Sequence, residues 1–302
     1  MKWRFIFVSV IFIAGSFFLH SFSEINDAYE FNRFWIEKTH GVGAQKFDVL
    51  ICGDSRVYRG VSSRVIAEKL TDYSVFNLSY SSGSYSDFML DYIEKHLNKG
   101  AKQPILILGI TPYSLTAKAA MDEHIRTELG RKKEEILEYR YFKSVKNHFE
   151  ALNLNTIMFK TREAPAAKYY QKYNYDEGWV ASYKNPADPK AALTEYTRDF
   201  LNNKVSHELT TGLLYRISKW TDKGFRVYGF RPPSTTEMVA LETKLSGFNE
   251  SDFVKEFERS GGKWINLDTK EYRSYDGSHL DENSAIKLSN TLGVFLQRET
   301  GN

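Results

Sequence analysis

Cysteine is nearly missing from this chain, which has a single one, Cys52, among its 302 residues. A lone cysteine has no partner in the same chain, so a framework of internal disulfides is excluded. Cys52 stands in an apolar segment, and the favoured interpretation is a small, buried, apolar side chain. A catalytic thiol is the less favoured alternative.

A large excess of charge of one sign is also missing. The 41 lysines and arginines nearly balance the 38 aspartates and glutamates, and the formal net charge is +3. The two kinds of charge are interspersed along the chain, whereas a nucleic-acid-binding face needs basic residues gathered together. We therefore expect no nucleic acid among the partners of this protein.

Motifs that hold a metal ion or a nucleotide are missing as well. The nearest approach to a metal site is Asp122-Glu123-His124, which lacks a second histidine at helical spacing. The serine-rich loop around Gly83 lacks the Gly-Lys-Ser/Thr ending of a phosphate-binding loop. The sequence thus predicts no metal site and no cofactor.

Long hydrophobic runs are scarce, and the one that stands apart lies at residues 5–19. The basic residues Lys2 and Arg4 precede this run, and acidic residues follow it from Glu24 onward. This arrangement keeps the start of a chain in the cytoplasm and sends the remainder across the membrane. Residues 1–22 are therefore predicted to be a signal anchor or a signal peptide, with the main domain outside the cytoplasm, periplasmic or extracellular. The uncleaved membrane anchor is favoured because no convincing cleavage site closes the run.

Downstream of that run, short apolar segments alternate with segments of helical periodicity. Such alternation is typical of an α/β domain with a mostly parallel sheet. Five strands are expected, at 47–52, at the start of 73–86, and at 104–112, 225–233 and 263–268. Helices are expected after the caps Ser62 or Ser63, at 87–97, 207–224 and 237–259, and after the caps Asp281 or Asn283. The predicted fold is a three-layer, flavodoxin-like α/β domain with a mostly parallel five-stranded sheet.

The alternation is interrupted once, by a charged helix that starts at Arg131 and by an aromatic loop. We interpret this stretch as an insertion or lid. The predicted segments are the membrane segment 1–22, a stem at 23–46, the core parts 47–115 and 206–302, and the insertion 116–205. The aromatic residues of the loop are Tyr169, Tyr170, Tyr173, Tyr175, Trp179 and Tyr183. They could stack on sugar rings or form a lid, and packing of the insertion onto the core is the favoured interpretation.

Two short motifs point to chemistry. Gly53-Asp54-Ser55 ends the first predicted strand, which places a serine at the carboxyl edge of the sheet, where open α/β folds keep their sites. Asp276 and His279 lie three residues apart in a loop before the last helix. This spacing lets Asp276 orient the imidazole, which can then take the proton of Ser55. The sequence predicts Ser55 as nucleophile, His279 as general base and Asp276 as its orienting partner.

A serine nucleophile also needs hydrogen-bond donors for the oxyanion that forms in the transition state. The predicted donors are the backbone amides of Ser55, at the start of a helix, and of Gly83, in the loop after the second strand. Glycine suits this role because it lets a backbone approach closely.

These residues resemble the SGNH/GDSL hydrolase superfamily, whose four sequence blocks supply a serine in Gly-Asp-Ser, a glycine, an asparagine and Asp-x-x-His. Ser55 matches the first block, Gly83 the second, and Asp276 with His279 the fourth. The resemblance covers both predicted core parts of the chain. It implies a serine hydrolase or acyltransferase with the flavodoxin-like fold predicted above.

The third block of that superfamily, Gly-x-Asn-Asp, is missing, because the chain has Gly109-Ile110-Thr111-Pro112 at that place. The departure removes the side-chain oxyanion donor that the family uses. Thr111 or Ser114 could replace it, or two amides could suffice at a rate lower by about a hundredfold.

The anchor and the residues after Ser55 are more similar to the cell-envelope branch of the superfamily, which contains acyl esterases and O-acyltransferases of surface polysaccharides. The resemblance implies an exported enzyme that acts on acyl esters, acetyl foremost, of an envelope glycan or on another ester substrate. Arg56, Arg59 and Arg231 could hold an anionic part of the substrate, although solvated surface arginines are the commoner case. The alternative is a non-catalytic protein of the same fold that binds glycans or acts as a scaffold.

Overall fold

The computed structural model of this protein describes residues 27–142 and 168–301. The predicted signal anchor at 1–22 lies outside these residues. Within the described ranges, no helix combines the length and the apolar character that a membrane span needs.

The described residues divide into two compact units, residues 27–37 with 130–142, and residues 38–129 with 168–301. The second unit is the larger one. It holds the sheet and all of the predicted site residues.

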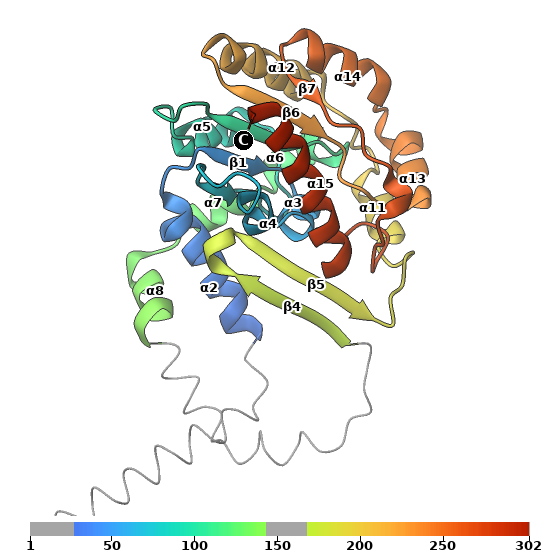
Figure 1. Ribbon diagram of the computed structural model, residues 1–302. Helices are drawn as coiled ribbons and strands as arrows, with labels where there is room; N and C mark the ends of the chain where they lie inside the picture. The colour runs from blue at the N-terminus through green and yellow to red at the C-terminus, as the bar shows by residue number, and fades with distance from the viewer. Residues whose placement is uncertain (1–26, 143–167, 302) are drawn as a thin grey trace, which may run out of the picture. The chain divides into compact units, whose positions relative to one another are not determined.

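The main sheet of the larger unit has five strands, each parallel to its neighbours (Figure 1). They are β1 (Val49–Cys52), β2 (Val75–Asn77), β3 (Ile105–Gly109), β6 (Arg226–Phe230) and β7 (Lys263–Trp264). Their order is β2-β1-β3-β6-β7, which is the order of flavodoxin-like sheets. The predicted parallel five-stranded α/β sheet is confirmed, and each strand is shorter than the apolar run that predicted it.

Both faces of this sheet are buried. Val49 and Ile51 pack in one core with apolar side chains of three helices on one face, while Leu50, which points to the opposite face, is also fully buried. The helices next to the sheet are α3 (Ser55–Gly60), α4 (Ser63–Ala67), α5 (Asp87–His96), α12 (His207–Asp222) and α15 (Glu282–Thr300). α15 contacts α3 and α4, whereas α12 contacts α5 and β6.

Two of the expected helix caps are confirmed. Ser62 accepts a hydrogen bond from the Val65 amide at the start of α4. Asp281 accepts one from the Ser284 amide at the start of α15. Each side chain thereby satisfies a backbone donor that has no partner inside its helix.

The single helix expected at 237–259 is wrong, because two helices occupy this range. They are α13 (Thr236–Ser246) and α14 (Glu250–Arg259). Gly247, with a φ of +73°, adopts the left-handed conformation that ends a helix. Asn249 then caps the second helix.

The aromatic loop expected inside the insertion is a β-hairpin instead. Its strands, β4 (Lys168–Asn174) and β5 (Trp179–Asn185), are antiparallel, with Tyr170 directly opposite Tyr183. Tyrosines are β-prone, and Gly178, with a φ of +64°, stands at the turn. The predicted loop is wrong because the aromatic residues of this segment also have a high strand propensity.

This hairpin belongs to the core of the larger unit. Trp179 and Ala181 are part of the same apolar core as β1, and the Trp179 indole donates to the Arg59 carbonyl oxygen at 2.8 Å. At the turn, the Glu177 carboxylate accepts a hydrogen bond from the Ser62 hydroxyl at 2.6 Å. Packing onto the core is therefore confirmed for Trp179, whereas three tyrosines of the hairpin stay exposed.

The other described parts of the insertion are helical. They are α6 (Ala117–Met121), α7 (His124–Leu129), α8 (Lys133–Leu137), the π-helical turn Glu138–Phe142 and α11 (Leu193–Asp199). The charged helix expected from Arg131 thus begins as α8, and its later residues lie outside the described ranges. In the smaller unit, Arg140 pairs with Glu37 at 2.9 Å. Glu37 is on α2 (Asp27–His40), a helix of 14 residues where the predicted stem contained only a turn or two.

Candidate active site

Ser55 stands where β1 ends and α3 begins. Gly53 lets the chain turn tightly at this point, because a Cβ there would lie 2.4 Å from the Val57 side chain. Asp54 caps α3 by accepting a hydrogen bond from the Arg56 amide at 2.9 Å. The strand, the glycine and the cap together present the Ser55 hydroxyl at the carboxyl edge of the sheet.

Ser55, His279 and Asp276 form one chain of hydrogen bonds. The His279 Nε2 atom lies 2.8 Å from the Ser55 Oγ, and the His279 Nδ1 atom lies 2.7 Å from the Asp276 Oδ2. The first contact joins the end of β1 to the loop before α15, segments that are 224 residues apart. A nucleophile, a base and an orienting carboxylate are connected in this way in serine hydrolases. The predicted contact between Ser55 and His279 is confirmed.

Asp276 is held by amides of its own loop. Its Oδ1 accepts hydrogen bonds from the backbone amides of Ser278 at 2.8 Å and of His279 at 2.7 Å. Burial alone would raise the pKa of Asp276, but its hydrogen bonds with His279 and these amides outweigh burial and hold that pKa well below its usual range. Asp276 is therefore ionised at neutral pH and keeps a proton on the Nδ1 atom, which leaves the Nε2 lone pair to the Ser55 hydroxyl.

His279 is a neutral base in this environment. Burial lowers its pKa, the positive charge of Arg59 lowers it further, and Asp276 opposes both effects. The net result is a pKa below the ordinary value of 6.5. At pH 7 the imidazole is uncharged and can take the proton of Ser55.

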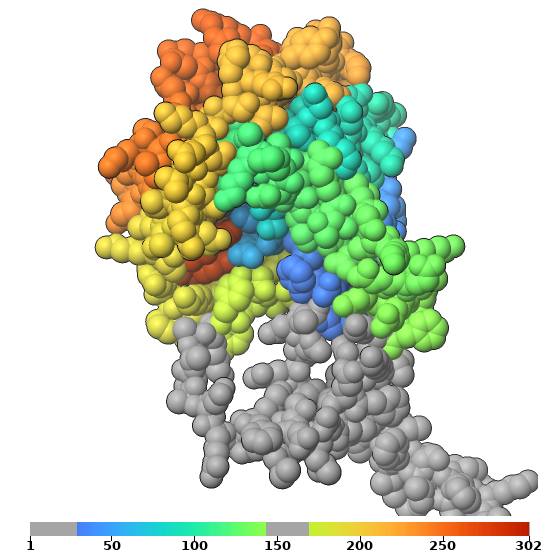
Figure 2. Space-filling model, turned by 180° about the vertical axis from the view of Figure 1, so that it is seen from behind, coloured from blue at the N-terminus to red at the C-terminus, as the bar shows by residue number. Residues whose placement is uncertain are grey.

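The three residues open into a polar cavity of about 290 Å³. Figure 2 shows this hollow between the yellow segment that contains α11 and the red carboxyl-terminal segment. The cavity is lined by Asp54, Ser55, Arg59, Ser81, Ser82, Tyr113, Ala192, Glu195, Tyr196, Asp199, Asp276 and His279. A substrate that enters this cavity meets the Ser55 hydroxyl and its base.

The two predicted oxyanion donors differ in the structure. The Ser55 amide has no hydrogen-bond partner among the described residues, and Ser55 lines the cavity. The Gly83 amide instead donates to the Tyr80 carbonyl oxygen at 3.1 Å, and Gly83 is not part of the cavity wall. Gly83 serves close packing, because a Cβ there would lie 2.4 Å from the Gly53 carbonyl oxygen. The prediction of Gly83 as an oxyanion donor is therefore corrected, since a turn occupies its amide.

Ser82, the residue before Gly83, lies in the cavity wall. Its φ of +49° is in the left-handed region, which costs a non-glycine residue about 1–2 kcal/mol. No partner of the Ser82 amide is found in the described part of the chain. Ser82 is thus the better candidate for the second amide donor. It could not be singled out from the sequence, because glycine is the residue expected at a point of close approach.

Thr111 and Ser114 do not replace the missing asparagine. The Thr111 hydroxyl donates to the Asp54 Oδ2 at 2.6 Å, and the Ser114 hydroxyl donates to the Thr111 carbonyl oxygen at 2.8 Å. Both side chains are fully buried, and neither lines the cavity. They support the helix cap instead: burial raises the pKa of Asp54, and the hydrogen bond from Thr111 is among the contacts that oppose this rise.

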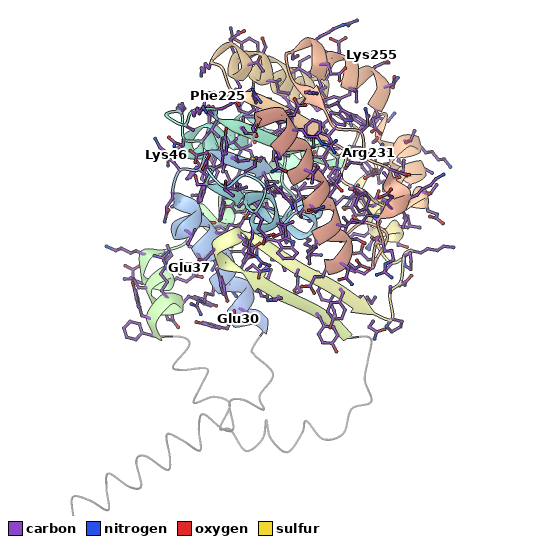
Figure 3. The ribbon with its side chains drawn as sticks, in the orientation of Figure 1. Glu30, Glu37, Lys46, Phe225, Arg231 and Lys255 are labelled. Atoms are coloured by element: carbon purple, nitrogen blue, oxygen red, sulfur yellow. The ribbon has the colours of Figure 1, made fainter. Side chains whose placement is uncertain are left out.

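Arg56 and Arg231 do not line the cavity. The Arg56 guanidinium is buried, with its Nη2 atom 2.6 Å from Glu242 on α13 and its Nε atom donating to the Ser278 hydroxyl at 2.9 Å. Arg231 lies at the end of β6 (Figure 3), where it pairs with Glu242 at 2.9 Å and with Glu250 on α14. The prediction of substrate binding is wrong for both arginines, because the buried Glu242 carboxylate pairs with both of them away from the cavity.

Arg59 is the predicted arginine that lines the cavity. Its Nε atom donates to the Tyr58 hydroxyl and its Nη1 atom to the Tyr275 hydroxyl, each at 2.9 Å. These bonds hold the guanidinium near His279, whose pKa it lowers. Contact of Arg59 with substrate stays a prediction.

Several residues of the cavity wall were not expected from the sequence, and the larger side chains among them are Tyr113, Glu195, Tyr196 and Asp199. Tyr113 follows β3 at the carboxyl edge of the sheet, and that position was a signal that could have identified it. The other three lie on α11, and no local pattern links α11 to the site. The Tyr196 hydroxyl accepts a hydrogen bond from Ser278 at 2.8 Å, which ties α11 to the loop that carries His279.

The Cys52 thiol takes no part in this chemistry. Cys52 is fully buried in β1, and burial raises the pKa of its thiol above the ordinary value. The favoured prediction for Cys52, a small buried residue, is confirmed. Across the described ranges, no group of three His, Cys, Asp or Glu side chains is arranged to hold a metal ion.

No protein-family model and no curated protein matches this chain. The chemistry of the cavity is therefore inferred from its own geometry.

Proposed function

We propose that this protein is an exported serine esterase or O-acyltransferase that acts on acetyl esters of a cell-envelope glycan. The observation that supports the chemistry is the hydrogen-bonded chain from Ser55 through His279 to Asp276, which lines one cavity. The export and the glycan come from the amino-terminal sequence and from the resemblance to envelope acyl esterases.

The first half of the proposed reaction forms an acyl-enzyme. The Ser55 oxygen attacks the ester carbonyl carbon while its proton passes to the Nε2 atom of His279. The negative charge that develops on the carbonyl oxygen is stabilised by the Ser55 and Ser82 amides. The carbon–oxygen bond to the sugar then breaks, and the leaving sugar oxygen takes the proton from His279.

The second half releases the acyl group. A water molecule or a sugar hydroxyl gives its proton to His279 and attacks the carbonyl carbon of the acyl-enzyme. The bond to Ser55 breaks, and the Ser55 oxygen regains the proton from His279. Water yields a free acid, which is hydrolysis, whereas a sugar hydroxyl yields a new ester, which is transfer.

The size and lining of the cavity favour a short acyl group. A volume of about 290 Å³ is at the low end of the roughly 300–1,000 Å³ of small-molecule sites. Its wall is mostly polar, and the residues of apolar character in it are Tyr113, Ala192 and Tyr196. A long acyl chain needs an extended apolar channel, so an acetyl group fits this wall better.

The charges around the cavity favour a neutral sugar over an anionic one. Arg59 is the single arginine in the wall, whereas Asp54, Glu195, Asp199 and Asp276 contribute carboxyl groups. Asp199 pairs with Lys118 at 2.6 Å, and the other carboxyl groups still outnumber Arg59. The anionic substrate expected from three arginines is therefore not part of the proposal.

The test of this proposal is labelling of the full-length protein, in its membrane fraction or in detergent, with a fluorophosphonate probe. We expect wild type to be labelled and Ser55→Ala to be unlabelled, with labelling strongly reduced in His279→Ala. Ser251→Ala, which removes an exposed serine on α14, is the matched control and should label like wild type. Equal labelling of wild type and Ser55→Ala would end the nucleophile proposal.

A second assay separates the two reactions. Acetate release from p-nitrophenyl acetate is compared with and without a neutral oligosaccharide as acceptor. Acetylated oligosaccharide as the main product identifies a transferase, and free acetate identifies an esterase.

One observation favours the alternative of a glycan-binding or scaffold protein without turnover. Neither Thr111 nor Ser114 replaces the side-chain oxyanion donor, because both hydroxyls are engaged elsewhere. This alternative predicts oligosaccharide binding together with no fluorophosphonate labelling of wild type.

A further inference from the structure

A second cavity lies beside the catalytic one, on the other side of the loop that carries His279. Its volume is about 700 Å³, and its wall includes Tyr183, Asn185, Tyr272, Arg273, Tyr275 and Asp281. We call it the tyrosine groove. It lies within the size range of small-molecule sites, about 300–1,000 Å³.

Tyr183 presents an aromatic ring to this groove. It lies on β5, where Trp179 and Ala181 of the same strand face pack into the core. The strand continues past the core, and the exposed fraction of Tyr183 is 40%. Tyr170, directly opposite on β4, stacks on Tyr183 with ring centroids 4.5 Å apart. The hairpin thus holds a flat, rigid, partly exposed ring at the mouth of the groove.

Tyr275 connects the groove with the catalytic cavity. Its ring lies nearly parallel to the His279 ring, with centroids 5.9 Å apart, and its hydroxyl accepts a hydrogen bond from Arg59 at 2.9 Å. Tyr275 lines the groove, whereas Arg59 and His279 line the catalytic cavity. The groove and the catalytic cavity are therefore lined by neighbouring residues of one loop, Tyr275 in the groove and His279 in the cavity.

The charges in the groove are balanced. Arg273 and Asp281 pair with each other at 3.3 Å, and the remaining charged wall residues are Lys184 and Glu282. Neither a polyanion nor a polycation is favoured by such a wall. Flat aromatic rings beside amide, hydroxyl and carboxylate groups are instead suited to a neutral ligand with both apolar faces and hydroxyl groups, which is the chemistry of a sugar chain.

We propose that the tyrosine groove binds a neutral oligosaccharide, the part of the glycan chain that flanks the residue in the catalytic cavity. Tyr183 stacks on one sugar ring, and Asn185 and Asp281 bind its hydroxyl groups. The role of this site in positioning a substrate rests on the esterase or acyltransferase proposal. Binding of the oligosaccharide does not depend on that proposal.

The experiment measures binding by isothermal titration calorimetry with the full-length Ser55→Ala protein in detergent, which removes any turnover. The probes are hexamers of xylose, mannose and N-acetylglucosamine. We expect at least one probe to bind, and Tyr183→Ala in the same background to weaken its binding about tenfold, the effect of losing one stacking contact of roughly 1.4 kcal/mol. Tyr183→Phe, which keeps the ring, should retain most of the affinity.

The matched control is Tyr215→Ala on α12, because Tyr215 is 65% exposed and lines neither the groove nor the catalytic cavity. Its affinity should equal that of the parent protein. Binding of none of the three probes, or equal affinity of Tyr183→Ala and its parent, overturns the groove proposal. If the groove proposal is overturned but fluorophosphonate labels the wild type, the catalytic proposal still holds. If a probe binds through Tyr183 but fluorophosphonate does not label the wild type, the groove proposal holds and the catalytic proposal is overturned.

Discussion

His279 is the residue whose charge controls the proposed chemistry. Its ring is placed between Ser55 and Asp276, and burial and Arg59 lower its pKa while Asp276 raises it. The effects that raise and lower the His279 pKa serve different steps of the proposed reaction. Asp276 orients the ring and stabilises the imidazolium that forms during reaction, whereas burial and Arg59 keep the resting base uncharged.

The lowered pKa of His279 predicts the acid side of the pH–rate profile. Only the neutral imidazole accepts the Ser55 proton, so kcat/KM for p-nitrophenyl acetate rises with pH through the His279 pKa. Because that pKa is below 6.5, we expect the midpoint below pH 6.5 and a rate close to its plateau at pH 7. Initial rates between about pH 4.5 and pH 8 measure this profile.

Arg59→Gln tests the cause of the shift. Removing the guanidinium charge removes one effect that lowers the His279 pKa, so the midpoint should move to higher pH. Arg64→Gln, on α4, is the control, because the Arg64 side chain is 64% exposed and its charge is screened by water. A midpoint that stays in place or falls in Arg59→Gln contradicts this account.

At the scale of elements, the site depends on how closely the turn after β1 approaches the loop after β2. Gly83 packs against the Gly53 carbonyl oxygen, and this contact brings Ser82 into the cavity wall. The glycine is therefore needed for the shape of the site, although its amide is used in a turn.

Gly83→Ala is expected to lower the free energy of unfolding by about 1–3 kcal/mol or more. A Cβ there would lie 2.4 Å from the Gly53 carbonyl oxygen, and backbone on both sides cannot move away as a side chain could. Urea unfolding measures the change. Gly212→Ala, in the middle of α12 with no atom within 4 Å of the added Cβ, should instead stabilise the protein by about 1 kcal/mol. Equal effects of the two substitutions would refute this explanation.

A second element-scale feature is the buried ion pair network behind the catalytic loop. Glu242 of α13 pairs with Arg56 at 2.6 Å and Arg231 at 2.9 Å, and Arg56 also binds Ser278 of the loop. Burial by itself would lower the pKa of Arg56, but the charge of Glu242 outweighs it, and the pKa is raised. The network ties α3, α13 and the catalytic loop together.

Glu242→Gln is expected to destabilise the protein by about 3–5 kcal/mol, because it leaves the buried Arg56 and the largely buried Arg231 without their shared carboxylate. The midpoint of urea unfolding measures this loss. Glu256→Gln removes a carboxylate that pairs with Arg259 at the surface, and its effect should stay within about 1 kcal/mol. A small effect of Glu242→Gln would show that the network is not needed for stability.

At the scale of the whole molecule, the amino-terminal apolar run at 5–19 predicts that the protein is anchored in a membrane. We expect the full-length chain to stay in the membrane fraction after washing with alkaline carbonate. The matched variant carries Ile11→Lys and Ile13→Lys, since each lysine in a span costs about 2.5–3.5 kcal/mol of insertion free energy. Loss of membrane association in this variant supports an anchor, and wild type in the soluble fraction contradicts it.

Much of the fold could be predicted because its signals are local. The apolar runs of β1 and β3 are contiguous segments that end at glycines, and the caps Ser62 and Asp281 stand directly before their helices. The hairpin β4–β5 and the break between α13 and α14 were not predicted. Their signals are single turn residues, Gly178 and Gly247, which aromatic content and helical periodicity do not reveal.

The sequence by itself determined the sheet, the position of Ser55 at its edge, and Asp276 and His279 as partners in one loop. Each follows from the order and spacing of neighbouring residues. Only the tertiary structure decided which charged and polar groups were already satisfied. Glu242 pairs with Arg56 and Arg231, and the Tyr80 carbonyl oxygen accepts the hydrogen bond of the Gly83 amide. Ser55 contacts His279 although the two residues are 224 positions apart in the sequence. Charge pairing and hydrogen-bond satisfaction act between groups that are close in space and distant along the chain, so the wall of the cavity could not be deduced from local patterns.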